Sequence, residues 1–465
     1  MRKLGMLIWG GLAVLGLCAN PAVAQKTSVA EEILGILRSE NKISEEKYQA
    51  LMSRAKAESE QREAGVEAFR RDPVADVKKS IDWLNRFSFS GDVRNRFEGF
   101  FQDGVNARTR ERVRLRFGAT MKITDEVMAG FRLVSGDPND PISANQTLGD
   151  AFTKKPFNLD QAYITITPKQ TIGLGDWAWN PISITAGKFA NPLFRPRAAS
   201  ISEMIWDEDL QPEGTSETLT FYEKPEGLLR RFQLNAIQWT TREAANQADS
   251  WVVGGQFVAL AQLLPVLRLT AAAGDYYFSH SSLLAQARNT NSSLKLTNSV
   301  ILKDGTIVQG GFPISPGTGN KVVQSYLGGF NIFNGSFQLD YDTGYPKWPA
   351  TLIGDFAFNT ESQNGKEFAV WTGLSLGVTK NPGDWAVSAL WAHTETNSVV
   401  SYFSFSDFGR DGGTNLQGPY LRVDYMLFPR LVLTAKNGFV SFIDRPPGQS
   451  NALVSRLQLD ATLAF

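Results

Sequence analysis

The chain has 465 residues with 47 basic and 47 acidic side chains, and 42% of it is hydrophobic and 11% aromatic. This neutral charge balance argues against a nucleic-acid binder, which would carry a basic surplus. Beyond residues 1–24, no apolar stretch is long enough to cross a bilayer as a helix, because the best candidate, residues 257–273, is interrupted by Gln262, Pro265 and Arg268.

Residues 1–24 have the pattern of a secretory signal peptide. Arg2 and Lys3 precede an apolar run, and the small residues of Ala22-Val23-Ala24 end it. A membrane anchor is one alternative, but the apolar run is short and a cleavage motif follows it. A lipoprotein signal at Cys18 is another, although Leu17 stands where such a signal has a small residue. Cys18 is the only cysteine and leaves with the signal, so we expect a mature chain without disulfides or cysteine chemistry.

Residues 25–86 form a second expected segment, a helical extension in the periplasm. Ile33, Ile36 and Leu37 lie on one face of a first helix, and Ser44 followed by acidic residues is typical of the start of a second one. The segment is too short for a core of its own. Two interpretations stay open here, a solvated linker helix and an oligomerisation coil.

From Phe87 to Phe465 the hydrophobic period changes to two, which predicts strands with one apolar and one polar face. About 16 strands are expected, near residues 87–94, 112–123, 127–133, 159–167, 182–188, 218–223, 231–240, 251–261, 267–278, 326–342, 351–359, 367–379, 385–393, 418–428, 431–442 and 453–465. Connections after even-numbered strands are mostly short, and those after odd-numbered strands are mostly long. Asn334-Gly335 is a possible hairpin turn, but loop parity favours one long strand with a bulge at residues 326–342.

The last strand alternates strictly from Leu457 and ends on an aromatic carboxy-terminus, Phe465. This resembles the recognition signal of bacterial outer-membrane barrels, in which an apolar face meets lipid and a polar face meets water. We therefore expect an all-β fold, a transmembrane antiparallel barrel over residues 87–465 in the outer membrane of a Gram-negative cell. Both ends of the barrel and the helical extension would lie in the periplasm.

Basic side chains recur on the polar face of the first strands. Because Val113, Leu115 and Phe117 must face lipid, the intervening arginines face the lumen. The candidate pore-lining, anion-attracting residues are Arg94, Arg96, Arg112, Arg114, Arg116, Lys122 and Arg132, and Arg456 of the last strand joins them if the barrel closes. Fixed guanidinium groups raise the local anion concentration in a narrow wet pore.

The opposing interpretation is that acids balance this basic wall. Asp92 and Glu98 lie on the same face, and further acids occur in the long loops, namely Asp137, Asp140, Asp150, Asp207, Glu208 and Asp209. Tryptophans near the predicted strand ends fit the aromatic girdles at the two membrane interfaces better than a sugar-stacking track.

An enzyme is not expected. The chain contains only two histidines, His280 and His393, and His280-Ser281-Ser282 are adjacent residues, which rarely form a catalytic triad. The acidic runs at 137–140 and 207–209 lack EF-hand spacing, and no P-loop or zinc motif occurs. We expect no cofactor, no metal and no nucleic-acid partner.

Taken together, several motifs resemble the putative porin family of Gram-negative outer membranes and, more distantly, the phosphate-selective porins O and P. They are residues 32–37, 43–48, 112–118, 145–150, 187–189, 206–207, 212–214 and Phe465. The resemblance implies a β-barrel channel that assembles as a homotrimer and has no cofactor. The lysine-rich constriction of the phosphate-selective members has no counterpart in this sequence.

The sequence thus predicts a passive pore for small hydrophilic solutes that prefers anions, narrowed by residues 279–324 folded inward. Its partners would be outer-membrane lipid, small solutes or anions, and two further copies of the chain. The alternative is a structural or partner-binding barrel anchored through its periplasmic helices, which a plugged lumen would favour.

Overall fold

The computed structural model describes residues 29–70, 82–198, 202–311, 314–410 and 412–465, and the chain divides into two compact units, Met1–Leu84 and Asn85–Phe465. The predicted signal peptide lies outside the described residues, as does Cys18. Within the described segments, no helix combines the length and the apolarity needed to cross a membrane.

The first unit contains two helices, α1 (Val29–Ser39) and α2 (Glu45–Arg70). As predicted, Ser44 precedes α2, where its hydroxyl accepts a hydrogen bond from the Lys47 backbone N–H at 3.4 Å. Arg38 links the helices, because it pairs with Glu45 at 2.9 Å and stacks on the ring of Tyr48. A short 3-10 helix, η1 (Asp82–Arg86), precedes the first strand.

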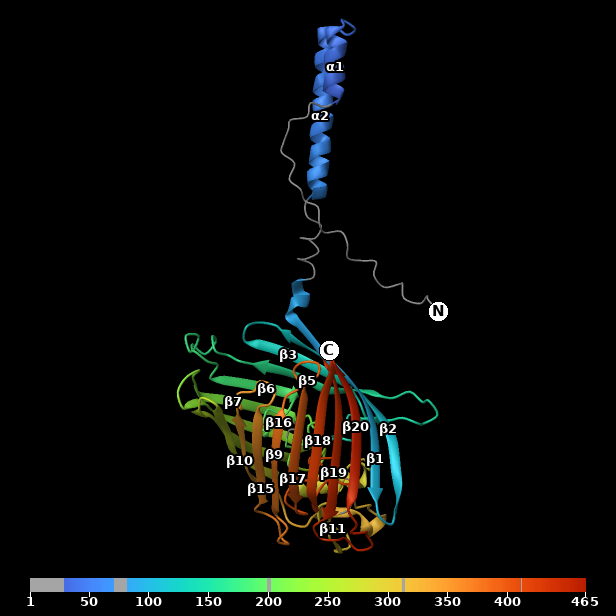
Figure 1. Cartoon of the computed structure of the whole chain (residues 1–465), viewed down its shortest axis with the longest axis vertical. Helices are drawn as coiled ribbons and strands as arrows, with labels where there is room; N and C mark the ends of the chain where they lie inside the picture. The colour runs from blue at the N-terminus through green and yellow to red at the C-terminus, as the bar shows by residue number, and fades with distance from the viewer. Residues whose placement is uncertain (1–28, 71–81, 199–201, 312–313, 411) are drawn as a thin grey trace. The chain divides into compact units, whose positions relative to one another are not determined.

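The second unit is a closed antiparallel barrel of 16 strands, as predicted. In Figure 1 the last strand, in red, lies beside the first, in blue, and their register runs from Asp92 opposite Ala464 to Phe101 opposite Ser455. The barrel strands are β1 (Phe87–Gln102), β2 (Val105–Lys122), β3 (Val127–Ser135), β5 (Phe157–Ile166), β6 (Ile182–Lys188), β7 (Glu213–Glu223), β8 (Leu229–Arg242), β9 (Ser250–Leu264), β10 (Leu267–Ser279), β14 (Asn331–Tyr341), β15 (Ala350–Asn359), β16 (Phe368–Gly377), β17 (Trp385–Thr394), β18 (Leu416–Phe428), β19 (Leu431–Phe442) and β20 (Val454–Ala464). A two-residue strand, β4 (Gln146–Thr147), pairs with β2 beyond the end of β3.

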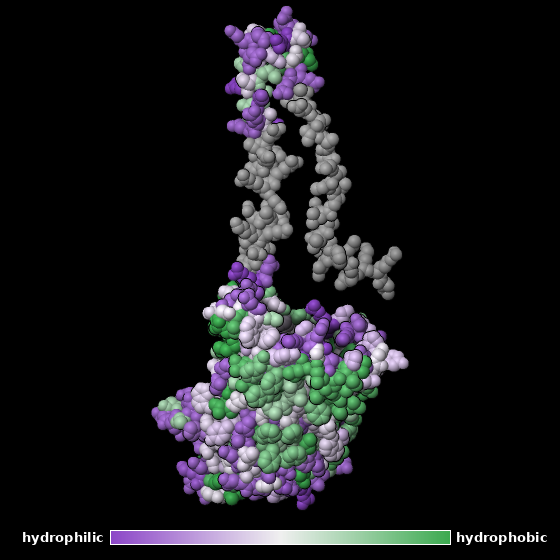
Figure 2. Space-filling view, turned by 90° about the vertical axis from the view of Figure 1, so that its left-hand side faces the viewer, coloured by the Kyte–Doolittle hydropathy of each residue, from purple (hydrophilic) through white to green (hydrophobic). Residues whose placement is uncertain are grey.

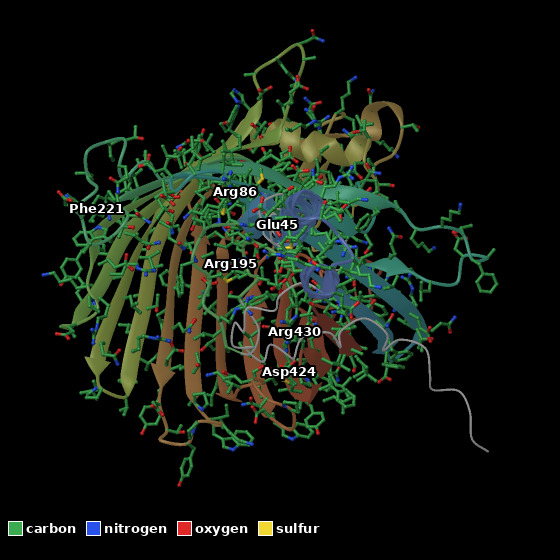
Figure 3. All side chains as sticks on the ribbon, turned by 90° about the horizontal axis from the view of Figure 1, so that it is seen from above. Glu45, Arg86, Arg195, Phe221, Asp424 and Arg430 are labelled. Carbon is green, nitrogen blue, oxygen red and sulfur yellow. The ribbon has the colours of Figure 1, made fainter. Side chains whose placement is uncertain are left out.

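The strands alternate as the hydrophobic pattern requires. Phe89, Phe97 and Leu115 are exposed on the outer face, whereas Arg96 and Arg114 between them are buried. Hydrophobic side chains form a band across the face of the barrel seen in Figure 2, and hydrophilic ones gather towards its ends. Figure 3 looks along the barrel and shows Phe221 at its outer edge and Arg195 inside the ring of strands.

The connections follow the predicted parity. Long loops join β3 to β5, β6 to β7, β10 to β14 and β17 to β18, and short turns join β2 to β3, β7 to β8 and β18 to β19. One exception is the β1–β2 connection, only Asp103-Gly104, where Gly104 adopts φ 75° and both strands extend beyond the predicted ends. A second is the β5–β6 connection, residues 167–181, which is long although it lies at the end with the short turns.

The segment at residues 326–342 contains one barrel strand, as parity predicted, and Asn334-Gly335 is not a turn. The expected bulge is absent from the described pairing, because Tyr326 belongs instead to β13 (Val323–Tyr326) of a separate sheet. That sheet also contains β11 (Val300–Leu302) and β12 (Ile307–Val308). The same loop forms α4 (Ser281–Gln286), η2 (Ala287–Asn289) and η3 (Gly319–Lys321).

The long loops are buried against one another. Asn298 of the β10–β14 loop donates to the carbonyl oxygens of Thr396 and Val399, both at 2.8 Å, and accepts from the Ser401 N–H. Thr297 and Thr414 join their hydroxyls at 2.9 Å. Since these buried polar groups are satisfied by each other, the β10–β14 and β17–β18 loops form one packed layer.

Candidate functional site

A wall of basic side chains lies inside the barrel on β1 and β2. The register places Arg94 opposite Arg114 and Arg96 opposite Arg112, all on the inward face. Like charges directly opposite each other are destabilising, so this wall requires acidic partners.

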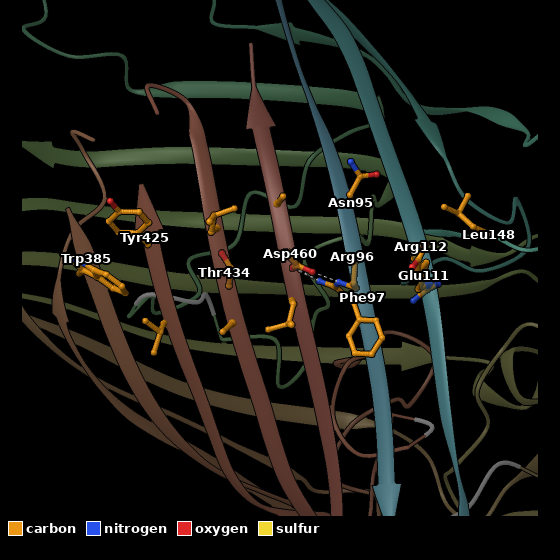
Figure 4. Close-up of a pocket in the computed structure, with 15 residues that line it drawn as sticks. Asn95, Arg96, Phe97, Glu111, Arg112, Leu148, Trp385, Tyr425, Thr434 and Asp460 are labelled. Atoms are coloured by element: carbon orange, nitrogen blue, oxygen red, sulfur yellow. Dashed lines mark hydrogen bonds and ion pairs between the residues drawn. The ribbon is translucent and has the colours of Figure 1, made fainter. Parts of the chain in front are cut away.

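The first set of partners comes from the strands themselves. Asp92 accepts two hydrogen bonds from Arg114, at 2.7 and 2.9 Å, and Asp460 of β20 accepts two from Arg96, at 2.6 and 2.8 Å (Figure 4). Glu98 accepts from Arg456 at 2.6 and 3.0 Å and also pairs with Arg110. Arg456 thus joins the wall. The Arg96–Asp460 pair is bidentate, whereas Arg114 and Arg456 each donate two hydrogen bonds to a single carboxylate oxygen.

The second set comes from loops that fold inward. Asp209 of the β6–β7 loop, residues 189–212, pairs with Arg116 and lies 3.8 Å from Arg114. Burial opposes ionisation of Asp209, but Arg116 and Arg114 outweigh it and hold its pKa below the usual range. Asp407 of the β17–β18 loop, residues 395–415, accepts from Arg96 and Arg456, both at 2.7 Å. Burial favours the neutral form of Asp407 too, yet the two arginines hold its pKa well below normal.

Arg112 and Arg94 donate their hydrogen bonds to neutral groups. Arg112 donates to Ser143 Oγ and the Asn145 carbonyl oxygen and lies 3.8 Å from Glu98. Arg94 donates to Asn145 Oδ1 at 2.6 Å.

Two predicted residues lie apart from this group. Arg132 of β3 pairs with Asp160 of β5 at 2.5 Å. The Lys122 side chain is 64% exposed at the end of β2 and pairs with Asp125. The structure therefore brings together the five predicted arginines of β1 and β2 and leaves Arg132 and Lys122 outside their network.

The β6–β7 loop is attached to the opposite wall through two amide side chains and one carboxylate. Gln256 of β9 accepts from the Phe194 N–H at 2.7 Å and donates to its carbonyl oxygen at 2.9 Å. Gln338 of β14 accepts from the Arg197 N–H at 2.9 Å, and Asp355 of β15 accepts from Ser202 Oγ at 2.6 Å. These contacts fix the loop inside the barrel, so the loop is a built constriction.

The far end of this loop is joined to the β17–β18 loop. Asp207 donates its N–H to the Phe403 carbonyl oxygen at 2.7 Å, and its carboxyl accepts from the Ser406 and Asp209 N–H groups at 2.9 and 2.8 Å. Burial and the neighbouring Glu203 raise the pKa of Asp207 well above normal. Burial and Glu208 raise the pKa of Glu203 to about 8.

Apolar burial explains why the loops fold inward. Trp206 is 3% exposed and lies against the rings of Trp239, Tyr276 and Phe278 of the wall and Phe403 of the β17–β18 loop. Burying one such side chain stabilises the inward fold by about 2–3 kcal/mol relative to a loop that leaves the side chain exposed to water. This cluster occupies part of the interior of the barrel, on the side of β8, β9 and β10.

A cavity of about 70 Å³ lies between the basic wall and the two loops. Its lining includes Arg94, Arg96, Arg114, Arg422, Lys436 and acids of both loops, among them Glu203, Asp209 and Asp407. Arg422 and Lys436 occupy inward positions of β18 and β19, where they lie opposite each other. The two-residue period of β18 and β19 predicts that both side chains face inward. Their position near the basic wall follows only from barrel closure, which places β20 beside β1.

Known proteins support this architecture. A family model described as "Putative porin" matches residues 101–309, which include Arg112, Arg114, Arg116 and the β6–β7 loop. The predicted resemblance to putative porins is confirmed. Among solved structures, the chain is similar to Pseudomonas putida OprB at high pH, with a TM-score of 0.51 and 11% identity over 83% of this chain and 96% of that one.

Two further porin structures give lower TM-scores. Salmonella typhi OmpF in complex with daunomycin gives 0.46, with 8% identity over 82% of this chain and 97% of OmpF. In-vitro folded Vibrio cholerae OmpT, in its trimer form, gives 0.42, with 11% identity over 82% and 99%. No match was found among curated proteins. The likeness to OprB is one of fold: a porin barrel.

The described residues contain no group of three or more His, Cys, Asp or Glu side chains placed to hold a metal ion. His280 begins α4 with φ 47° and contacts the Asp249 carbonyl oxygen, whereas His393 of β17 contacts Gln417. The two histidines therefore lie on separate elements with separate partners.

The structure differs from the predicted constriction in one respect. The acids that reach the basic wall come from residues 189–212 and 395–415, whereas residues 279–324 pack with the β17–β18 loop. The signal for this inward fold is the apolar content of residues 189–212, of which Phe189, Leu193, Met204 and Trp206 are buried.

Proposed function

We propose that this porin-like barrel is an outer-membrane channel for passive diffusion of small hydrophilic solutes, with a preference for anions. The observation that carries the proposal is the basic wall of β1 and β2, which faces a constriction loop inside a closed barrel. Basic groups on a narrow wet path raise the local anion concentration and repel cations. No catalysis is involved in this function.

The acids of the wall weaken this preference without removing it. Asp92, Asp209 and Asp407 neutralise Arg114, Arg116 and part of the Arg96 charge. Arg94 and Lys436 have weaker acidic contacts, since Lys436 lies 3.4 Å from an Asp460 that already binds Arg96. The net field along this side therefore favours anions.

The test is the zero-current potential of the purified protein in a planar bilayer under a salt gradient. We expect open steps and an anion-sided potential. The potential should be smaller in Arg114→Ala, which leaves Asp92 with only the 3.9 Å contact to Arg116. Arg268→Ala is the matched control, because Arg268 is half exposed and pairs with Asp340 at the end with the short turns. A cation-sided potential in the wild type would refute anion preference.

A second function is favoured by the packed interior. The loops that surround Trp206 and Asn298 fill part of the barrel, and a barrel filled across its width would serve as a structural or partner-binding protein. A folded barrel, confirmed by its gel mobility before and after heating, that gives no current steps would support this function instead.

We also propose that the helical unit lies in the periplasm, because the end with the short turns is the periplasmic end of outer-membrane barrels. The chain termini enter the barrel at that end, before Phe87 and after Ala464. Proteolysis of intact cells should leave α1 and α2 uncut, whereas cleavage in permeabilised cells should remove them.

The proposed assembly is a homotrimer. An apolar hollow of about 660 Å³ lies on the barrel surface, lined by side chains such as Trp385, Leu433, Ala435 and Leu459 (Figure 4). Exposed Asn95 and Glu111 border this hollow. Lipid would leave these polar groups without partners, whereas a second copy of the chain can supply them.

Filling the hollow tests the assembly. Ala435→Trp should convert the oligomer to monomer on unheated gels and in light scattering, and Ala273→Trp, at an exposed site on β10, should not. A monomeric wild type, or an oligomer that tolerates Ala435→Trp, would refute the proposed interface.

A further inference from the structure

Two cations of the cavity between the wall and the loops are only weakly compensated by acids. Arg94 makes a single hydrogen bond, from Nη2 to Asn145 Oδ1, and in the described part of the chain no carboxylate pairs with it. Lys436 has only the 3.4 Å contact with Asp460. Each of these side chains therefore has donors left for a ligand.

The other cations of the cavity are occupied. Arg96 is bound by Asp460 and Asp407, and Arg114 is bound by Asp92. Arg422 pairs with Asp424 at 2.7 Å. Arg197 lies 3.6 Å from Glu208. Among the described residues, Arg94 therefore has no carboxylate partner, and Lys436 shares Asp460 with Arg96.

The cavity also limits the size of the ligand. Its volume of about 70 Å³ corresponds to roughly five water molecules at about 10–15 Å³ of probe volume each. A carboxylate with a short carbon chain fits this space. A large sugar or peptide does not.

The acids of the cavity limit the charge of the ligand. Glu208, Asp209 and Asp407 line the cavity and repel a second negative charge. A monovalent anion gains the attraction of Arg94 at a smaller repulsive cost than a divalent one. Arg94 is also suited to a carboxylate, since a planar guanidinium matches two carboxylate oxygens.

We propose that Arg94 binds the carboxylate of a small monovalent solute inside the barrel and that Lys436 strengthens this binding through its charge. This proposal rests on the proposed channel function. It attributes the anion preference of the channel to a saturable binding site at Arg94. Solutes would pause at Arg94 before crossing the constriction.

Two readouts keep the site and the channel distinguishable. Calorimetric titration of propionate into the detergent-solubilised protein at pH 7 measures binding whether or not the barrel conducts. Propionate inhibition of the chloride current in bilayers measures the same site in the open channel. The matched divalent probe is sulfate.

We expect saturable propionate binding, weakened about tenfold or more in Arg94→Gln, because a hydrogen bond to a charged group is worth about 1.5–3 kcal/mol and 1.4 kcal/mol is tenfold. Lys436→Gln should weaken binding a few-fold. Arg231→Gln removes the same charge at a half-exposed site beside Glu223 and should leave binding unchanged.

The outcomes separate clearly. Propionate binding in detergent without any current would reject the channel function and keep the site. Current without saturable propionate binding would keep the channel and reject the site. Tighter binding of sulfate than of propionate, or equal binding in Arg94→Gln and the wild type, would also overturn the proposal.

Discussion

The Asp407→Asn substitution tests how strongly one loop acid controls the basic wall. Asp407 lies in the β17–β18 loop and bridges Arg96 and Arg456, each at 2.7 Å. Both arginines keep another acid after the substitution, since Arg96 retains Asp460 and Arg456 retains Glu98. The barrel should therefore fold, while the wall gains one unit of net positive charge.

The expected size follows from Coulomb's law. For an anion about 10 Å from the lost carboxylate, the interaction is about 0.4 kcal/mol in a water-like dielectric and about 1.7 kcal/mol at an effective dielectric constant of about 20. At 1.4 kcal/mol per factor of ten, the local anion concentration should rise about two- to twentyfold. The loop also loses two charge-assisted hydrogen bonds, each worth about 1.5–3 kcal/mol, and the amide oxygen of the introduced asparagine replaces them in part.

The assay is the zero-current potential under a potassium chloride gradient. The permeability ratio of chloride to potassium should increase at least twofold, and raising the salt concentration should reduce the difference. The control is Asp444→Asn, which removes a half-exposed carboxylate that pairs with Lys366 at 2.9 Å. An unchanged ratio, or a shift towards potassium in a folded Asp407→Asn barrel, would refute the electrostatic role of the wall.

Two further predictions concern the β6–β7 loop. The raised pKa of Glu203, about 8, means that the folded state favours the neutral carboxyl, so its contribution to loop docking is complete below its ordinary pKa of 4.5 and is lost as the pH rises to about 8. Ionisation of Glu203 adds a negative charge beside the basic wall, so anion preference should fall between pH 7 and pH 9. Glu203→Gln should abolish this fall. A wild-type zero-current potential that does not change over this range would contradict the assignment. Gln256→Ala should weaken loop docking by about 1–3 kcal/mol, because it leaves the partly buried N–H and carbonyl groups of Phe194 without their partner, and single-channel conductance should increase. Gln233→Ala, a neighbouring amide on β8 that bonds Asn235, provides the control, and equal conductance in both variants would argue against a constriction at Phe194.

Sequence periodicity predicted the barrel well because strand alternation is a local property. The arginines of β1 and β2 face inward for the same reason that Val113 and Leu115 face outward, and a two-residue period determines both. The tight Asp103-Gly104 turn was not predicted. The outer ends of β1 and β2 carry charged residues that interrupt the alternation of apolar and polar side chains, so the predicted strands ended too early.

The partners of the arginines were less accessible to sequence reasoning. Asp209 was recognised as an acid able to balance the wall, but Asp407 was not, because a loop of residues 395–415 has no period that indicates where it folds. The pairing of Asp460 with Arg96 depends on barrel closure, which joins residues 364 positions apart. Such contacts are fixed by tertiary packing and have no local signature.

The attachments of the β6–β7 loop also determine the order in which the protein can assemble. Ser202 binds Asp355, a residue 153 positions later, and Asp207 binds Ser406, 199 positions later. Loop closure over such distances is entropically costly until the intervening strands are paired. The constriction therefore cannot be complete before β15 and the β17–β18 loop are in place, so the narrowing of the interior is a late event in assembly.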